Sequence, residues 1–560
     1  MKEYKLTRVL LSVILLVLVV LLSRWVDLRW DLTADKRYTL APEAAELVRH
    51  LDEELVITSL LEGEVPSSFR LLKSYIDDYL FELKRYNSNI QIVYKDVLSG
   101  TPEEKEVFQS FLSERGVVPI RRQVASDEEV NQNLLYPYLS IHTDDDITFV
   151  NLLERGSIES TEEESLVDAQ LAFESNLLRA IQKITRKSTP DIHILGSAAE
   201  LLAEGCARDN RFDSYRYVAS DAAKILSDVE AVDGIICVVK KEDLPREELL
   251  ALDIAAGKGI PVIWAIDKTD VTLDSLRGVE ANYLAISHEY GVEDYLFRSG
   301  LKIAPSLIMD IQSSRIPQVI NSGAVGAQTR LLPYPFHPVI LTGASNPVHA
   351  RLVSPLSTYF ASPIQLLEYP KSVMKTPLLS TGSYTKVIST PYLLDFAFMQ
   401  KAPDPKEYNR GEQLISVEIE GRVKPYFQNR LTTEDISLLD QYDITYNTDS
   451  QYIHQIVISD VDWLMPSSSQ RGFFPVGYNA YENQMYDANA ELLVNLIEYL
   501  VDGDDLIALK EKFSSISYLD RQKLASQTSW YYFILLGLPL IALMCLYICY
   551  HLVRRRKYAL

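Results

Sequence analysis

The stretch GIICVVKKEDLPREELLALDIAAGKGIPVIWAID, which runs from Gly234 to Asp267, decides the predicted fold. Two short apolar runs, GIICVV and PVIWAID, enclose a segment from Pro245 to Ala256 that ends at Gly257, which predicts a helix between two buried strands. A strand, a helix and a second strand form a βαβ unit, and such units build a parallel sheet with helices on both faces. We therefore expect an α/β domain around this stretch.

The α/β pattern continues on both sides of this unit. Asp191–Ser197, DIHILGS, precedes it as a strand, and Leu414–Glu420 and Ile453–Ser459 follow it as strands. Met485–Val501 has the apolar spacing of a helix. The sequence predicts one α/β domain over residues 189–503, although the Pro-, Ser- and Gly-rich stretch from 305 to 401 indicates no clear elements.

A different order of elements precedes residue 189. Strands are predicted at 54–61 and 90–97, and a hairpin of two strands at 135–142 and 147–153. Helices are predicted at 66–86, 102–115 and 161–188. The order β-α-β-α-β-β-α is that of a thioredoxin-like domain, here residues 27–188. Redox chemistry in such a domain needs a reactive cysteine, and this stretch contains none. We expect an inert scaffold or a binding module.

Two apolar segments predict a membrane anchor at each end. Residues 9–26 contain the run VLLSVILLVLVVLL and lack the small residues of a cleavage site, which favours an uncleaved signal anchor over a cleaved signal peptide. Residues 530–553 begin with an aromatic cluster and are followed by Arg554–Lys557. Both segments are expected to be transmembrane helices.

The flanking charges predict the orientation. Basic residues lie in the short tails 1–8 and 554–560, so both termini are expected in the cytoplasm. Residues 27–529 would then be a large periplasmic region of an inner-membrane protein, with 504–529 as a connector helix. The membrane lipid bilayer is thus an expected partner.

The composition argues against nucleic-acid binding, and the absence of known catalytic motifs argues against catalysis. A net charge of −22 lacks the basic footprint that nucleic-acid binding needs. The chain has no nucleophile elbow, no Walker A loop and no H-E-x-x-H motif. Cys237 lies in an apolar strand and is expected in the core, with a disulfide to Cys206 as the alternative. The prediction is no enzyme, no catalytic residue, no cofactor and no metal.

Polar residues at predicted strand ends are the ligand-binding candidates. These are Ser197, Glu200, Asp267, Asp460 and Asp462. In open α/β sheets ligands bind outside the carboxyl ends of strands, where these acids could bind a sugar or a cation. The alternative is that they form loops and cap helices.

The chain resembles the GldG family, gliding-motility-associated ABC transporter auxiliary proteins labelled as substrate-binding components. The resemblance rests on runs spread along the chain, which include DIHILGS, LPREELLALDIAAGKGIPVIWAID, LFRSGLKIAPSLIMD, VEIEGRVKPYFQNR and QIVISDVDWL. It implies that residues 189–503 form a flavodoxin- or glutamine-amidotransferase-like parallel α/β domain. The family often has a His-Gly-Glu-like run after the first strand of this domain. This chain reads SAAE at 197–200 and keeps only the acid.

The resemblance also implies partners and a function. A polytopic ABC permease subunit and a cytoplasmic ABC ATPase of a Bacteroidota-type bacterium would complete the complex, with an envelope saccharide or lipid as a possible ligand. The prediction is a non-enzymatic auxiliary or substrate-binding subunit. The alternatives are an envelope scaffold that binds no substrate and, with less support, a membrane-anchored hydrolase.

Overall fold

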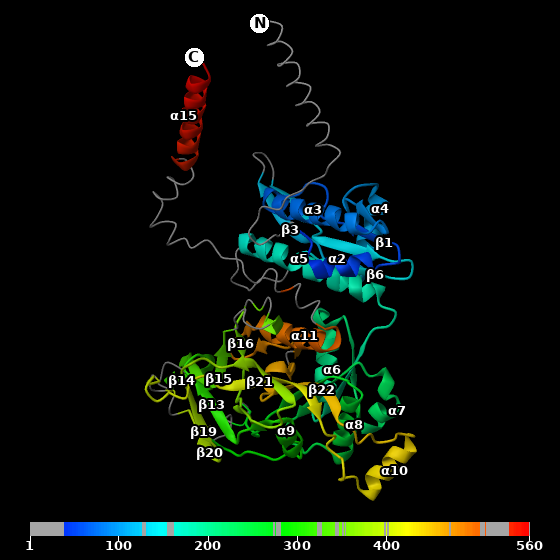
Figure 1. Cartoon of the computed structure of the whole chain (residues 1–560), viewed down its shortest axis with the longest axis vertical. Coiled ribbons are helices and arrows are strands. Elements are labelled where there is room, and N and C mark those ends of the chain that lie inside the picture. The colour runs from blue at the N-terminus through cyan, green and yellow to red at the C-terminus, as the bar shows by residue number, and fades with distance from the viewer. Residues whose placement is uncertain are drawn as a thin grey trace. The chain divides into compact units, whose positions relative to one another are not determined.

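The computed structural model describes residues 39–125, 130–153, 162–272, 282–321, 328–341, 347–349, 354–396, 403–469, 472–503 and 537–558, with single residues 275, 352, 399 and 510. The chain divides into two compact units, Met1–Ser514 and Ser515–Leu560. Figure 1 shows a four-stranded sheet and a larger seven-stranded sheet within the first unit.

The four-stranded sheet has the order β2-β1-β5-β6. Its strands are β1 (Leu55–Ser59), β2 (Ile90–Tyr94), β5 (Tyr138–His142) and β6 (Ile147–Asn151). β1 and β2 are parallel, and the other pairs are antiparallel. These strands lie within the ranges that the sequence predicts. A helix α2 (Pro42–Arg49) and a hairpin of β3 (Ile120–Ala125) and β4 (Val130–Leu135) were not predicted.

Side chains alternate between the two faces of this sheet because successive strand residues point to opposite sides. Ile57, Leu139 and Ile141 pack in a core with α2, α3 (Arg70–Tyr86) and α5 (Glu162–Thr185). The opposite face carries a smaller core that includes Leu60 and Leu112, covered by α4 (Pro102–Glu114). Three helices thus pack on one face of this sheet, and α4 packs on the other.

The seven-stranded sheet has the order β18-β21-β22-β10-β9-β7-β8. The strands are β7 (Asp191–Gly196), β8 (Arg216–Ala219), β9 (Gly234–Val239), β10 (Val262–Ile266), β18 (Val373–Ser380), β21 (Leu414–Val423) and β22 (Gln451–Ile458). From β22 to β8 all neighbours are parallel, whereas β21 and β18 join antiparallel.

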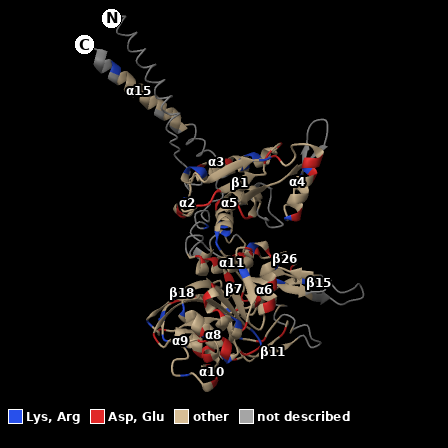
Figure 2. Cartoon of the chain, turned by 90° about the vertical axis from the view of Figure 1, so that its right-hand side faces the viewer, with Lys and Arg blue, Asp and Glu red and all other residues tan. Residues whose placement is uncertain are grey.

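Helices cover both faces of this sheet, which explains the unbroken apolar runs of its strands. In β9, Ile235 and Cys237 face one core with α7 (Ala222–Ser227), α8 (Arg246–Gly257), α9 (Glu293–Ser299) and α10 (Thr433–Gln441). Ile236 and Val238 face the other core with α6 (Ala199–Arg208) and α11 (Asp487–Val501). The first turns of α4, α8 and α10 contain acidic residues, and the ribbon of Asp and Glu residues is red in Figure 2.

Small sheets fill the stretch that the sequence left undefined, and further short elements follow it. They are β11 (Tyr283–Ala285) with β20 (Tyr392–Leu394), β12 (Leu301–Ile303) with β17 (Ile364–Leu366), β13 (Ser306–Asp310) with β19 (Thr385–Ser389), β14 (Ser313–Asn321) with β15 (Gln328–Ile340) and β16 (Leu356–Ser357), β23 (Ser467–Ser469) with β24 (Gly472–Phe474), and β25 (Tyr478–Asn479) with β26 (Gln484–Met485). Tyr334, Phe336 and Phe360 form an aromatic core between these sheets.

The predicted fold class is wrong in two respects. The second sheet is mixed rather than parallel, and many small sheets accompany it. No helix among the described residues is long and apolar enough to cross a membrane, which contradicts an inner-membrane protein with one transmembrane helix at each end. The predicted periplasmic placement of residues 27–529 rested on those two helices.

Most of the two predicted spans lies outside the described residues. This applies to residues 9–26, to 530–536 and, apart from Lys510, to the predicted connector at 504–529. The described helix at this end, α15, covers Leu538–Tyr558 and contains Arg554–Lys557 in its last turns. Its apolar part is therefore shorter than the roughly 20 apolar residues that a transmembrane helix needs.

Candidate functional site

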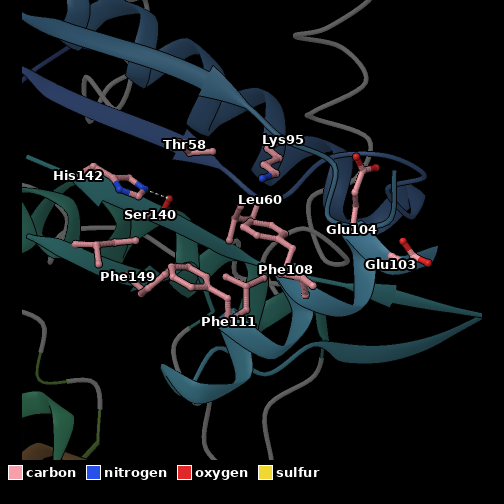
Figure 3. Close-up of a pocket in the computed structure, with 13 residues that line it drawn as sticks. Thr58, Leu60, Lys95, Glu103, Glu104, Phe108, Phe111, Ser140, His142 and Phe149 are labelled. Atoms are coloured by element: carbon pink, nitrogen blue, oxygen red, sulfur yellow. Dashed lines mark hydrogen bonds between the residues drawn. The ribbon is translucent and has the colours of Figure 1, made fainter. Parts of the chain in front are cut away.

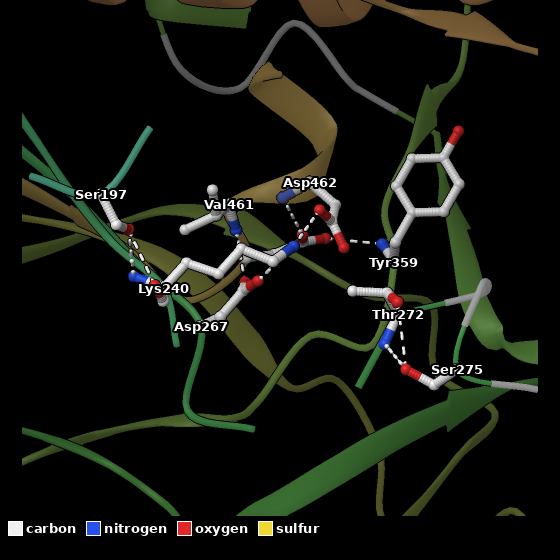
Figure 4. Close-up of polar contacts among 9 residues, drawn as sticks. Ser197, Lys240, Asp267, Thr272, Ser275, Tyr359, Val461 and Asp462 are labelled. Atoms are coloured by element: carbon white, nitrogen blue, oxygen red, sulfur yellow. Dashed lines mark hydrogen bonds and ion pairs between the residues drawn. The ribbon is translucent and has the colours of Figure 1, made fainter. Parts of the chain in front are cut away.

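Four strand ends meet at one edge of the seven-stranded sheet. β22, β10, β9 and β7 are neighbours and parallel, so the residues that follow them lie side by side. Asp267 follows β10, Asp460 and Asp462 follow β22, Lys240 follows β9, and Ser197 follows β7. Figure 4 shows the side chain of Lys240 extending between the carboxylates of Asp267 and Asp462.

Lys240 is the centre of this edge. Its Nζ lies 2.9 Å from Oδ2 of Asp267 and also pairs with Asp462, and only 14% of its side chain is exposed. Burial disfavours the charged ammonium, but the two carboxylates outweigh burial and raise the pKa of Lys240. The ammonium therefore stays charged and held, and it is not a free amine nucleophile.

The two buried carboxylates accept hydrogen bonds from the backbone as well. The N–H of Val461 donates to Oδ1 of Asp267 at 2.6 Å. The N–H groups of Tyr359 and Asp462 donate to the two oxygens of Asp460, at 2.6 and 2.9 Å. Burial raises the pKa of Asp267 to about 6, although Lys240 opposes the shift. Burial, and then the charge of Asp267, raise the pKa of Asp460.

Ser197 joins the same edge through the backbone of Lys240. Its hydroxyl donates to the carbonyl oxygen of Lys240 at 2.8 Å, and the N–H of Lys240 donates to Oγ at 3.3 Å. The preceding residue, Gly196, has φ +93°, and a Cβ built there would lie 1.9 Å from the carbonyl oxygen of Val238. Glycine is required at this close approach of β7 and β9.

Glu200 is separate from this cluster. It lies exposed in the first turn of α6 and, within the described part of the chain, forms no ion pair with Lys240. The structure thus brings together Ser197, Asp267, Asp460 and Asp462, and places Glu200 apart. Ligand binding by these five residues stays a prediction.

The cluster is closed by its own contacts. Each of the three aspartates has a lysine or backbone partner, so a cation or sugar at this edge would have to compete with contacts within the cluster. In the described ranges no group of three or more His, Cys, Asp or Glu side chains could hold a metal ion. The contacts join the loops after β9, β10 and β22 to one another.

The two cysteines near this sheet do not provide a reactive thiol either. Cys206 and Cys237 are both buried and free, so the alternative of a disulfide between them is wrong. Burial raises the pKa of both thiols, which disfavours the reactive thiolate.

The pocket on the four-stranded sheet was not predicted. A cavity of about 640 Å³ lies between α4 and strands β1, β5 and β6 (Figure 3). Leu60, Phe108, Phe111 and Phe149 form much of its wall. The apolar spacing within α4 is a signal for it, since these aromatic residues face a sheet that a single helix covers.

Comparisons with solved structures give only weak similarity. The N-terminal domain of mmIFT52 has a TM-score of 0.28 at 9% identity, over 56% of this chain and 97% of that domain. A ThuA-like protein from Bacteroides uniformis ATCC 8492 has a TM-score of 0.25 at 11% identity, over 56% and 94%. Both TM-scores are too low to support a conclusion about this chain. No curated protein matches it.

Two family models match the sequence. A domain of unknown function, DUF7088, matches residues 34–142, which include most of the four-stranded sheet. A family described as an ABC-type uncharacterized transport system, ABC_transp_aux, matches residues 207–496, which is more than half of the chain and covers most of the seven-stranded sheet. The chain belongs to this ABC-type transport system family.

Proposed function

We propose that this chain is a non-catalytic auxiliary subunit of an ABC transport system of the gliding-motility-associated GldG type. Family membership points to an accessory role beside other ABC transport components. The runs DIHILGS and QIVISDVDWL, on which the resemblance to the GldG family rests, form β7 and β22 and the turns that follow them. A permease and an ATPase are the proposed partners.

The observation that carries a non-catalytic role is the closed edge around Lys240. In open α/β sheets this edge is where ligands and catalytic groups collect. Here Lys240 pairs with Asp267 and Asp462, and backbone N–H groups donate to Asp267 and Asp460. A catalytic acid or base must reach its substrate, and the two carboxyls with raised pKa, Asp267 and Asp460, are buried within this cluster.

Purification of the complete chain from its native host tests this proposal. An affinity tag on the chain, with mild detergent extraction, should co-purify a permease subunit and an ATPase. Recovery of the wild-type chain without either partner, in several detergents, would refute the association.

The closed edge also favours a second candidate, a scaffold that organises partners and binds no substrate. The exposed members of the predicted site, Ser197 and Glu200, distinguish the two. A double variant S197A/E200Q should leave a scaffold's function in the host unchanged and the partners bound. Loss of function with the complex intact would instead support substrate binding at this edge.

A further inference from the structure

The pocket beside α4 has the size and lining of a small-molecule site. Its volume of about 640 Å³ lies within the range of roughly 300–1,000 Å³ that ligand pockets occupy. Leu60 and Leu112 are fully buried at its back, and Phe108, Phe111 and Phe149 are half-buried along it. Aromatic rings that are neither covered by protein nor fully in water favour an apolar ligand body.

One end of the pocket is polar and uncharged. Thr58 and Ser140 lie on its sheet wall, and Oγ of Ser140 lies 3.1 Å from Nε2 of His142. Figure 3 shows His142 and Ser140 together at the end away from α4. Burial lowers the pKa of His142, so the imidazole is neutral near pH 7 and able to take part in a hydrogen bond without a charge.

Two cations lie over the aromatic rings of α4. Nζ of Lys95 is 3.6 Å from the ring centroid of Phe108, and the guanidinium carbon of Arg115 is 3.9 Å from that of Phe111. The two phenyl rings stack, with centroids 6.1 Å apart. Over the ranges that the structure describes, neither Lys95 nor Arg115 has a carboxylate partner.

The two glutamates at the pocket lie in the first turn of α4. Glu104 is occupied by the helix cap, where its Oε2 accepts from the N–H of Thr101 at 2.9 Å. Glu103 lies in the exposed first turn of α4. In Figure 3 both glutamates lie at the far side of the rings from His142, whereas Lys95 lies above the aromatic rings. A ligand body over these rings would therefore meet Lys95 before it meets a carboxylate.

We infer that this pocket binds an amphipathic anion, with its apolar body against Phe108, Phe111 and Phe149 and its acidic head beside Lys95. In a chain of net charge −22, an unpaired cation at an apolar pocket is the feature that selects for a negative head. This site is distinct from the strand-end cluster and is independent of the proposed transport partners.

Three probes with one tail and different heads test the inference. Decanoate, decyltrimethylammonium and decyl maltoside share an aliphatic chain and carry a negative, a positive and an uncharged head. Isothermal titration of the full chain, with each probe below its micelle concentration, should give saturable binding of decanoate at one site. The cationic probe should bind about tenfold more weakly or not at all, because it places a like charge beside Lys95.

Variants of the chain test the contact with the head group and the contact with the apolar body separately. K95M should weaken decanoate binding about fivefold, as expected for one partly exposed ion pair, and should not change the uncharged probe. K84M, on the exposed side of α3, is the matched control and should leave all three probes unchanged. I147W places an indole in the pocket and should abolish binding of every probe, with folding checked by its melting temperature.

Several results would overturn the inference. Equal binding of all three probes would show a non-specific apolar surface, and tighter binding of the cationic probe would reverse the assigned head. Decanoate binding that persists in a folded I147W chain would place the site elsewhere, and no binding by any probe would leave no ligand site at α4.

Discussion

His337 should make the stability of this protein depend on pH. Its side chain is fully buried in β15, and Tyr334, Tyr359 and Phe360 lie around it with ring centroids 4.8, 4.9 and 4.9 Å away. Neither ring nitrogen has a hydrogen-bond partner in the described part of the chain. Burial lowers the pKa of His337 to about 3, because no nearby acid compensates for loss of water around the imidazolium.

The lowered pKa of His337 determines the direction and the size of the change in unfolding free energy with pH. A base whose folded pKa is lowered contributes stability above its unfolded pKa of about 6.5, and that contribution is lost as the pH falls toward the folded value. At pH 5 the unfolded chain holds a proton on this residue and the folded chain does not. Below the unfolded pKa the cost is about 1.36 kcal/mol for each pH unit, and pH 5 lies about 1.5 units below it, so His337 alone removes about 2 kcal/mol of unfolding free energy between pH 7 and pH 5.

The assay is urea unfolding of the full chain at both pH values, followed by tryptophan fluorescence. H337L replaces the imidazole with an apolar side chain of similar volume, and H50L makes the same change at an exposed position. The loss of stability between pH 7 and pH 5 should be about 2 kcal/mol smaller in H337L than in wild type, and unchanged in H50L. Equal pH dependence in wild type and H337L would refute the argument, because it would mean that His337 takes up its proton in the folded state.

Three further predictions concern the seven-stranded sheet. K240M should lower the unfolding free energy by about 3–5 kcal/mol, since it leaves buried carboxylates unpaired, whereas the exposed E200Q should change it little; urea unfolding compares the two. G196A should cost about 1–3 kcal/mol or more, because it adds a Cβ at a left-handed residue that has no space for it, and thermal melting measures this. The thiols of Cys206 and Cys237 should resist iodoacetamide in the folded chain and react after unfolding, as mass spectrometry would show; fast labelling of the folded chain would contradict their burial.

The sequence was informative where the periodicity of one element is regular. GIICVV and PVIWAID became β9 and β10 because runs that are buried on both faces have few alternatives to a central strand. The stretch from 305 to 401 was not predictable for a physical reason. β15 contains three prolines within LLPYPFHPVI, and its pairing with β14 shifts register, so neither propensity nor alternation marks it as a strand.

The ends of the chain gave the largest error. The apolar composition of residues 530–553 and the basic residues after them predicted a membrane span. The described helix α15 covers Leu538–Tyr558 and includes Arg554–Lys557, and no helix among the described residues is long and apolar enough to cross a membrane.

The candidate site shows which part of a strand-end argument can be made from sequence. Acids after β10 and β22 were expected to converge because the carboxyl ends of parallel strands share an edge, and Asp267 does lie beside Asp462 through their common partner Lys240. Lys240 directly follows β9 and falls under the same argument, but it was not among the predicted site residues. Buried carboxylates need a countercharge, so a lysine at a neighbouring strand end is what their burial requires. At this edge the acids and Lys240 therefore form an ion cluster, and the exposed residues beside it are Ser197 and Glu200.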